Sequence, residues 1–276
     1  MLEEKLGRNV TLEIVKTTDF GVYLGTKEDK VLLPARQVPE GAGIGDAVDV
    51  FLYRDSKDRI IATTHEPKIR MGEVKALKVK DTGAIGAFLD WGLEKDLFLP
   101  FRQQTAKVKP GDECLVGLYK DKSGRLCATM KVYDRLEKNS PYKKDDRVQG
   151  IIYEKSLNFG LFVAVDDRYC ALIPRREASG RYKVGDRISA RVTDVKPDGK
   201  LDLSVREKAF IQMDADAQAV MDKLLENGGE LPFTDKADPE LIRAQFGFGK
   251  NAFKRAVGRL LKEGKIEIRE KSIAIK

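Results

Sequence analysis

The feature that most restricts how this chain can fold is a set of four sequence landmarks that occurs three times in the same order. Each copy contains a glycine preceded by a large apolar residue, an aliphatic residue before a proline, a Gly-Asp pair and a closing apolar stretch. The glycines are Gly21, Gly86 and Gly160, and the prolines are Pro34, Pro100 and Pro174. The glycine and the proline are 13, 14 and 14 residues apart, and the Gly-Asp pair begins 11 residues after the proline in every copy. This fixed spacing indicates three copies of one structural unit.

Apolar residues inside each copy alternate with polar ones, as in residues 10–14 and 188–192. That period of two is typical of β-strands, and turn sequences such as residues 196–200 separate the strands. About five strands fit into each unit of roughly 65–75 residues, and closing them into a small barrel leaves no unpaired edge. We therefore predict a mainly β protein with three tandem five-stranded barrels, in which the repeat glycine marks a bend or bulge.

The last part of the chain changes to a helical period and predicts a small α+β domain. A helix is expected over residues 209–225, a second one after the start signal Asp238-Pro239, and a third from about Lys250. The apolar face of the third helix is expected to consist of Phe253, Ala256, Val257, Leu260 and Leu261. Two short apolar stretches near the end can form a hairpin, and three helices with a terminal hairpin are typical of a winged helix.

At the repeat landmarks the sequence resembles the S1 RNA-binding domain, an OB-fold barrel. The three S1-like units are expected at residues 1–65, 66–138 and 145–208, and the winged helix at residues 211–276. In this order the domains resemble the conserved virulence factor B (CvfB/YitL-type) family of bacterial regulatory proteins across the whole chain. The resemblance implies RNA binding in the post-transcriptional control of gene expression, as expected of a virulence regulator.

Two positions depart from the S1 pattern. Family members often carry a histidine where this chain has Pro34, Pro100 and Pro174, so one customary contact to nucleic acid is missing from all three copies. The second copy has Ile85 in place of its first aromatic residue, which removes one stacking surface.

Aromatic side chains that stack on bases and cations that follow the phosphates hold single-stranded nucleic acid. The stacking candidates lie beside the repeat glycines: Phe20, Tyr23, Phe88, Phe159 and Phe162. The candidate cations follow the proline landmark or open the last strand: Arg36, Arg59, Arg102, Arg125, Arg175, Arg176 and Lys200. Paired aromatic residues are three positions apart and would face opposite ways on a regular strand, so a bend must bring them together.

In the alternative interpretation, the aromatic residues complete the barrel cores and the cations only face solvent. We favour this core role for the second copy. We favour binding for the third copy, because Phe159 and Phe162 lie in a segment, residues 141–210, with a net charge of +4. Residues 1–65 have a net charge of −2.

Charge also divides the C-terminal domain, with a net charge of −5 over residues 211–249 and +6 over residues 250–276. We predict that the basic part faces nucleic acid through Lys250, Lys254, Arg255, Arg259, Lys262, Lys265 and Arg269. Alternatively, these cations form a solvated surface or a protein-docking face.

Composition excludes several classes of protein. No stretch approaches the roughly 20 apolar residues that span a bilayer, and the first residues lack the pattern of a secretory signal, so we expect a cytoplasmic protein without membrane partners. Three unevenly spaced cysteines predict neither disulfides nor a zinc site. A single histidine and the lack of recognised catalytic motifs argue against an enzyme, and we expect no cofactor or metal.

We therefore expect a protein that binds RNA, in single-stranded form and with low sequence specificity. The net charge of +7 agrees with a polyanionic partner. Two alternatives stay open: an adapter that docks ribosomal or polymerase proteins, and a DNA-binding regulator that acts through the winged helix. The RNA target, the arrangement of the domains and the oligomeric state are left open by the sequence.

Overall fold

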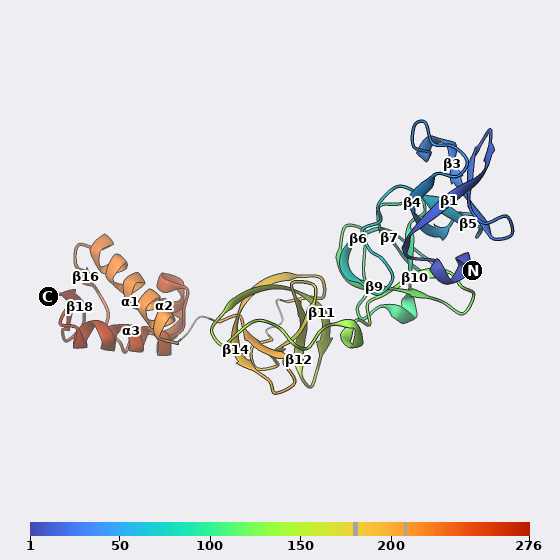
Figure 1. The fold of residues 1–276 in the computed structure, drawn as a ribbon. Coiled ribbons are helices and arrows are strands. Elements are labelled where there is room, and N and C mark those ends of the chain that lie inside the picture. Colours follow the sequence, from blue (N-terminus) through green and yellow to red (C-terminus); the bar gives the residue numbers. More distant parts are fainter. Residues whose placement is uncertain (179–181, 207–208) are drawn as a thin grey trace. The chain divides into compact units, whose positions relative to one another are not determined.

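The structure is a computed structural model that describes residues 1–178, 182–206 and 209–276, the stretch 209–214 by its backbone alone. The chain divides into two compact units, Met1–Val205 and Arg206–Lys276. Within the described part, the first unit holds three closed five-stranded barrels and the second holds three helices and a small sheet (Figure 1). The predicted fold class is confirmed. The predicted end of the third S1-like unit, residue 208, lies outside the described residues.

The first barrel follows a short 3-10 helix, η1 (Leu2–Lys5). Its strands are β1 (Asn9–Thr18), β2 (Gly21–Gly25), β3 (Lys30–Pro34), β4 (Ala47–Arg54) and β5 (Ile60–Thr63). They close in the order β1-β2-β3-β5-β4, with β3 parallel to β5 and the other pairs antiparallel. Alternate side chains such as Ile14, Leu24 and Leu33 point inward and are fully buried.

The second barrel repeats this topology. Its strands are β6 (Val74–Gly83), β7 (Gly86–Asp90), β8 (Leu97–Pro100), β9 (Glu113–Lys120) and β10 (Leu126–Thr129). They close in the order β6-β7-β8-β10-β9 around a core that includes Leu77, Leu89 and Leu99. A short 3-10 helix follows the landmark proline both here, at η3 (Phe101–Gln103), and in the first barrel, at η2 (Ala35–Gln37).

The third barrel has the same strand order, β11-β12-β13-β15-β14. Its strands are β11 (Arg147–Ser156), β12 (Gly160–Val165), β13 (Tyr169–Pro174), β14 (Arg187–Val195) and β15 (Leu201–Ser204). Its core includes Ile152, Val163 and Ile173. The 3-10 helix η4 (Tyr133–Arg135) lies between the second and third barrels.

The predicted bend is built from a bulge and a glycine in each barrel. The pairing of the first two strands shifts between Ile14 and Lys16 in the first barrel and at matching places in the other two. The glycine that opens the second strand is required by close packing of the backbone. A Cβ atom on Gly21 would lie 2.1 Å from the carbonyl oxygen of Leu33, and one on Gly160 would lie 2.1 Å from that of Ile173. The repeat glycine therefore allows the second strand to pack tightly against the third.

Neighbouring barrels share apolar contacts. The indole of Trp91 packs edge-to-face against Phe51 and Tyr53 of β4, with centroids 5.9 and 6.1 Å apart, so β4 contributes to the core of the second barrel. A second shared cluster joins Leu115 of β9 to Tyr153 of β11 and residues around η4. These clusters hold the barrels together within the first unit.

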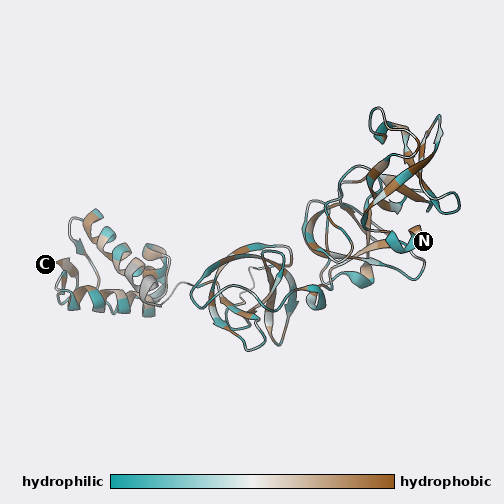
Figure 2. Ribbon diagram, in the orientation of Figure 1, coloured by the Kyte–Doolittle hydropathy of each residue, from teal (hydrophilic) through white to brown (hydrophobic). Residues whose placement is uncertain are grey.

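The second unit contains α1 (Ala209–Glu226), β16 (Glu230–Leu231), α2 (Pro239–Phe246), α3 (Lys250–Lys262), β17 (Ile266–Ile268) and β18 (Ile273–Ile275). As predicted, the Asp238 side chain caps α2 by accepting a hydrogen bond from the Glu240 backbone N–H. Phe253 and Leu260 of α3 are buried, and apolar and polar residues alternate along this helix (Figure 2). Leu261 is 45% exposed, so its predicted place on the buried face is wrong. It lies at the exposed edge of the apolar stripe. The strand β16, which the sequence did not predict, completes the sheet in the order β16-β18-β17.

Candidate nucleic-acid interface

The aromatic residues beside the repeat glycines come together in the first and third barrels. Phe20 lies in the turn before β2 and Tyr23 lies on β2, and their ring centroids are 6.4 Å apart in edge-to-face contact. Phe159 and Phe162 repeat the arrangement at 6.3 Å. Phe20 is 58% and Phe159 is 62% exposed, whereas the second ring of each pair is half-buried. Because the first ring precedes the strand, the two rings of each copy meet at the barrel surface.

The second barrel carries a different aromatic pair. Ile85 is 65% exposed at the first aromatic position, and Phe88 instead contacts Phe98 on β8, with centroids 5.5 Å apart. Phe88 is half-buried, as Tyr23 and Phe162 are, and the core role favoured for it stays a prediction. The alternation along β7 turns Ala87 and Leu89 inward and Phe88 outward. Sequence reasoning missed Phe98, because the other two copies have leucine at this position.

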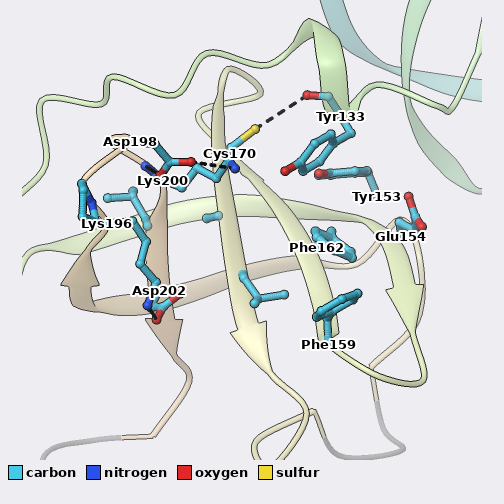
Figure 3. Close-up of a pocket in the computed structure, with 14 residues that line it drawn as sticks. Tyr133, Tyr153, Glu154, Phe159, Phe162, Cys170, Lys196, Asp198, Lys200 and Asp202 are labelled. Atoms are coloured by element: carbon cyan, nitrogen blue, oxygen red, sulfur yellow. Dashed lines mark hydrogen bonds and ion pairs between the residues drawn. The ribbon is translucent and has the colours of Figure 1, made fainter.

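A pocket of about 720 Å³ opens beside the aromatic pair of the third barrel (Figure 3). Its walls come from β11, β12, β13, the hairpin between β14 and β15, and η4. The lining residues are Tyr133, Tyr153, Glu154, Phe159, Phe162, Cys170, Ala171, Leu172, Lys196, Pro197, Asp198, Lys200, Leu201 and Asp202. The predicted residues Phe159, Phe162 and Lys200 thus share one site.

Tyr133 joins this pocket from outside the five strands of the barrel. Its ring lies edge-to-face on Phe162, with centroids 6.0 Å apart, and the Lys200 ammonium lies 5.5 Å from its centroid. Backbone hydrogen bonds hold the segment after η4 on β13: the Glu137 N–H donates to the Arg168 carbonyl, and the Cys170 N–H donates to the Glu137 carbonyl. The repeat landmarks do not include this segment, so Tyr133 was missed.

Tyr153 of β11 forms a second part of the pocket wall that the sequence did not reveal. Its side chain is 1% exposed, and its ring centroid lies 6.2 Å from that of Phe162. The hydroxyl has no hydrogen-bond partner among the described residues. Burial raises the pKa of Tyr153, so the hydroxyl keeps its proton and can donate a hydrogen bond.

Two exposed ion pairs line the polar side of the pocket. Lys200 contacts Asp198 at 2.7 Å, and Lys196 contacts Asp202 at 2.7 Å. The hydrogen bond to Asp198 raises the pKa of Lys200, and the bond to Asp202 raises the pKa of Lys196. Both ammonium groups therefore stay charged over the usual pH range, in reach of a bound anion.

A backbone hydrogen bond joins the segment after the proline landmark to the first aromatic position. The residue directly after the proline donates its backbone N–H to the carbonyl of the first aromatic position in every barrel. This donor is Ala35 in the first barrel, Phe101 in the second and Arg175 in the third. The backbone of Arg175 therefore lies directly beside that of Phe159, with a distance of 2.9 Å between the Arg175 nitrogen and the Phe159 carbonyl oxygen.

The remaining predicted arginines are exposed. Arg36, Arg102 and Arg176 lie at the surface. Arg102 and Arg125 line one shallow pocket of the second barrel together with Phe98 and Phe101. Phe101 is 55% exposed and was not among the residues predicted from the sequence.

Carboxylates from the hairpins partly neutralise two of the predicted cations. Arg59 contacts Asp55 at 2.7 Å, and Arg125 contacts Asp121 at 3.4 Å. Arg59 and hydrogen bonds from the hairpin backbone lower the pKa of Asp55 despite its partial desolvation. These carboxylates stay ionised and keep the arginines paired.

The first barrel also covers part of the second barrel's aromatic face. A pocket of about 340 Å³ beside Phe88 and Phe98 is lined by Arg54, Ser56 and Asp58 of the first barrel. The Asp58 carboxylate lies 3.3 Å from the Lys95 ammonium and 4.0 Å from the Arg125 guanidinium. The Lys95 ammonium also donates a hydrogen bond to the Asp55 carbonyl.

In the winged helix, acidic neighbours pair three of the seven predicted cations. Arg259 and Lys265 both contact Glu263, at 2.8 and 2.9 Å, and Arg269 contacts Glu267 at 2.7 Å. The other predicted cations are Lys250, whose ammonium donates to the Lys236 carbonyl, and the exposed Lys254, Arg255 and Lys262. Arg255, Arg259 and Lys262 flank the exposed Gly258 in a hollow on α3.

Three further observations concern the described residues. They contain no group of three or more histidine, cysteine or acidic side chains arranged to hold a metal ion. None of the described helices has both the length and the apolar composition to cross a membrane. The three cysteines are free and buried.

Family models match most of the chain. An S1 domain model matches residues 6–65 and again residues 71–131. The model of the second domain of the virulence regulatory factor CvfB matches residues 133–207, which include Tyr133 and the third barrel. The model of the CvfB-like winged helix domain matches residues 218–275.

Whole proteins of similar sequence and structure support these matches. The uncharacterized protein YitL of Bacillus subtilis is 31% identical over 94% of this chain and 90% of its own length. Conserved virulence factor B of Staphylococcus saprophyticus is 30% identical over 84% of this chain and 80% of its own length. A crystal structure from Streptococcus pneumoniae, described as a multidomain protein with nucleic acid binding domains, is similar with a TM-score of 0.56, 25% identity and 99% coverage of both chains.

Proposed function

The chain belongs to the conserved virulence factor B family, and from this premise we propose that it binds single-stranded RNA without catalysing a reaction. The S1 models and the nucleic acid binding domains of the Streptococcus pneumoniae protein support a nucleic-acid partner. The match to a domain of a virulence regulatory factor supports a regulatory role, which we place in the control of gene expression at the level of RNA. Weak contacts in two linked units gain affinity from effective concentration.

One observation carries the proposal: an exposed aromatic pair, an open pocket and cations meet on the third barrel. Phe159 and Phe162 offer faces on which bases can stack, and such stacking tolerates any base. Arg175 begins beside Phe159, and Lys196 and Lys200 stand across the pocket. This combination suits a flexible single strand, whose bases are free to leave the backbone and enter a pocket.

The winged helix supplies a second contact in this proposal. Lys254, Arg255 and Lys262 project from α3 outside the ion pairs that join Arg259 and Lys265 to Glu263. Cations on such a helix contact the phosphate backbone and add affinity without sequence information. Duplex DNA is the alternative partner of this helix.

A titration of the full chain with labelled single-stranded RNA at 50 and 200 mM salt tests the proposal. For each phosphate contact, the slope of log K against log salt is expected to be about −0.7. With four contacts, binding weakens about 50-fold over this range. Unlabelled duplex DNA is expected to compete poorly with the RNA.

Four results would contradict the proposal. Absence of binding at low salt would rule out RNA as the partner. An affinity that does not depend on salt would show that the chain makes no phosphate contacts. Stronger competition by duplex DNA would favour the DNA-binding alternative. Co-purification of ribosomal or polymerase proteins after nuclease treatment, without RNA binding, would favour the adapter.

A further inference from the structure

The pocket of the third barrel is larger and more varied than a stacking surface requires. Its volume of about 720 Å³ lies in the range of about 300–1,000 Å³ that is typical of small-molecule sites. Aromatic rings form one wall, from Tyr133, Tyr153 and Phe162, and two ion pairs form another. A flat platform for stacking would need neither the depth nor the polar groups.

The hydroxyl of Tyr153 is the strongest sign of a ligand. The large majority of buried side-chain polar atoms in proteins have a hydrogen-bond partner, because leaving one unpaired costs free energy. This hydroxyl has none among the described residues, although its side chain is 1% exposed. It points from β11 toward the pocket, and the Tyr133 ring lies beside it (Figure 3). A ligand group in the pocket would supply the missing partner.

The neighbouring ring can give access to this hydroxyl. Tyr133 is 37% exposed and is carried by η4, outside the barrel strands. Exposed side chains change rotamer within nanoseconds, so the ring can turn aside while Phe162 and Tyr153 stay in place. Tyr133 would then lie over the ligand from the open side.

We propose that this pocket receives one nucleobase of a bound RNA strand, whose edge accepts a hydrogen bond from the Tyr153 hydroxyl. The inference rests on the proposed function and deepens it, because it makes one position of the strand sensitive to base identity. The base lies against Phe162 and Tyr133, and its phosphate lies near Lys196 and Lys200. Stacking on Phe159 holds the neighbouring nucleotide without selecting it.

Removing a single oxygen tests this inference. The full chain and its Tyr153→Phe variant are titrated with four homopolymeric single-stranded RNAs of equal length. We expect the wild-type chain to prefer one or two bases by about threefold to tenfold, as one net hydrogen bond allows. Tyr153→Phe should bind all four within about twofold of one another, with the same salt dependence as the wild-type chain.

Tyr142→Phe is the matched control. The Tyr142 hydroxyl donates to Asp166 at 2.5 Å on the same barrel and does not line the pocket, so its removal should leave base preference unchanged. Thermal unfolding adds a second readout. Tyr153→Phe removes an unpaired hydroxyl and should leave the melting temperature unchanged or raise it, whereas Tyr142→Phe should lower it.

The outcomes separate this inference from the proposed function. If the wild-type chain binds RNA but does not distinguish the four bases, or if Tyr153→Phe keeps the preference, the base pocket is wrong while RNA binding stands. If the wild-type chain binds none of the RNAs, the proposed function itself fails. A lower melting temperature of Tyr153→Phe would show that the hydroxyl has a partner within the fold, and would also overturn the inference.

Discussion

The second and third barrels have the same topology and the same landmarks, yet they present different surfaces to solvent. The third barrel has an open pocket of about 720 Å³ beside its aromatic pair. In the second barrel, the corresponding hollow is about 340 Å³ and is partly walled by the hairpin of the first barrel. The difference teaches that binding capacity in a repeat protein depends on what each copy packs against as well as on its own motif.

A few substitutions account for much of the contrast. The hairpin between the last two strands begins with Asp121 in the second barrel and with Lys196 in the third. Asp121 pairs with Arg125 four residues later, whereas Lys196 adds a cation to that side of the pocket. The residue beside the first aromatic position is Phe101 in the second barrel and Arg175 in the third. Each of these two changes adds a cation to the third barrel at a position where the second barrel has none.

The largest expected effect comes from the aromatic pairs. Replacing both Phe159 and Phe162 by alanine should weaken RNA binding about 30-fold or more, because each stacked base contributes about 1–3 kcal/mol. The matched double variant in the second barrel, Phe88→Ala with Phe98→Ala, should change affinity less than threefold. Fluorescence anisotropy with one labelled RNA measures both, and circular dichroism checks the folds. Equal losses of affinity in the two double variants would show that both barrels bind RNA, which would contradict the proposed difference between them.

The hairpin charge gives the next largest effect. Lys196→Asp places in the third barrel the residue that opens the hairpin in the other two. It removes one cation and adds an anion beside the pocket, so RNA affinity in 0.1 M salt should fall about tenfold and the salt slope should flatten by about 0.7 or more. Lys122→Asp, in the exposed hairpin of the second barrel, is the control and should have a much smaller effect. An unchanged slope would show that Lys196 does not contact phosphate.

Arg175 tests the cation beside the first aromatic ring. Arg175→Ala should weaken binding about fivefold in 0.1 M salt and reduce the slope by about 0.7, as expected for the loss of one phosphate contact. The backbone hydrogen bond to Phe159 does not involve the side chain, so the melting temperature should not change. Arg36→Ala in the first barrel serves as the control. If Arg175→Ala and Arg36→Ala lower the affinity and the salt slope equally, the position of Arg175 beside the aromatic ring gives it no special role in RNA binding.

The sequence predicted the fold of this chain more completely than it predicted the site. The spacing of the landmarks determines three barrels, and the glycines explain how rings three residues apart can meet. The sequence did not reveal Tyr133, Tyr153 or Phe98. Their contacts depend on side chains that come together from different strands or from the segment between two barrels. The sequence shows which residues recur in each copy. Only the structure shows which side chains from different segments meet around one pocket.

The smallest expected effect concerns the first-barrel hairpin that covers the second barrel. Asp58 has a positive φ of 60°, a conformation that favours glycine, and glycine stands at the matching positions of the other two hairpins, Gly124 and Gly199. An aspartate there accepts some backbone strain while its carboxylate lies 3.3 Å from Lys95 and 4.0 Å from Arg125. The exposed contacts are each worth at most about 1 kcal/mol, so the carboxylate acts mainly by neutralising the two cations.

Asp58→Gly removes that charge and relaxes the backbone. Overall RNA affinity in low salt should rise about twofold, because one carboxylate beside Lys95 and Arg125 is lost, although Arg125 keeps its pair with Asp121. Added to the variant that lacks Phe159 and Phe162, the same change should restore a measurable part of the lost binding. Asp58→Asn, which removes the charge and keeps the shape, should give the same gain if charge is the cause. Loss of affinity in both variants would mean that the hairpin supports RNA binding by the second barrel, which would reverse the contrast between the two barrels.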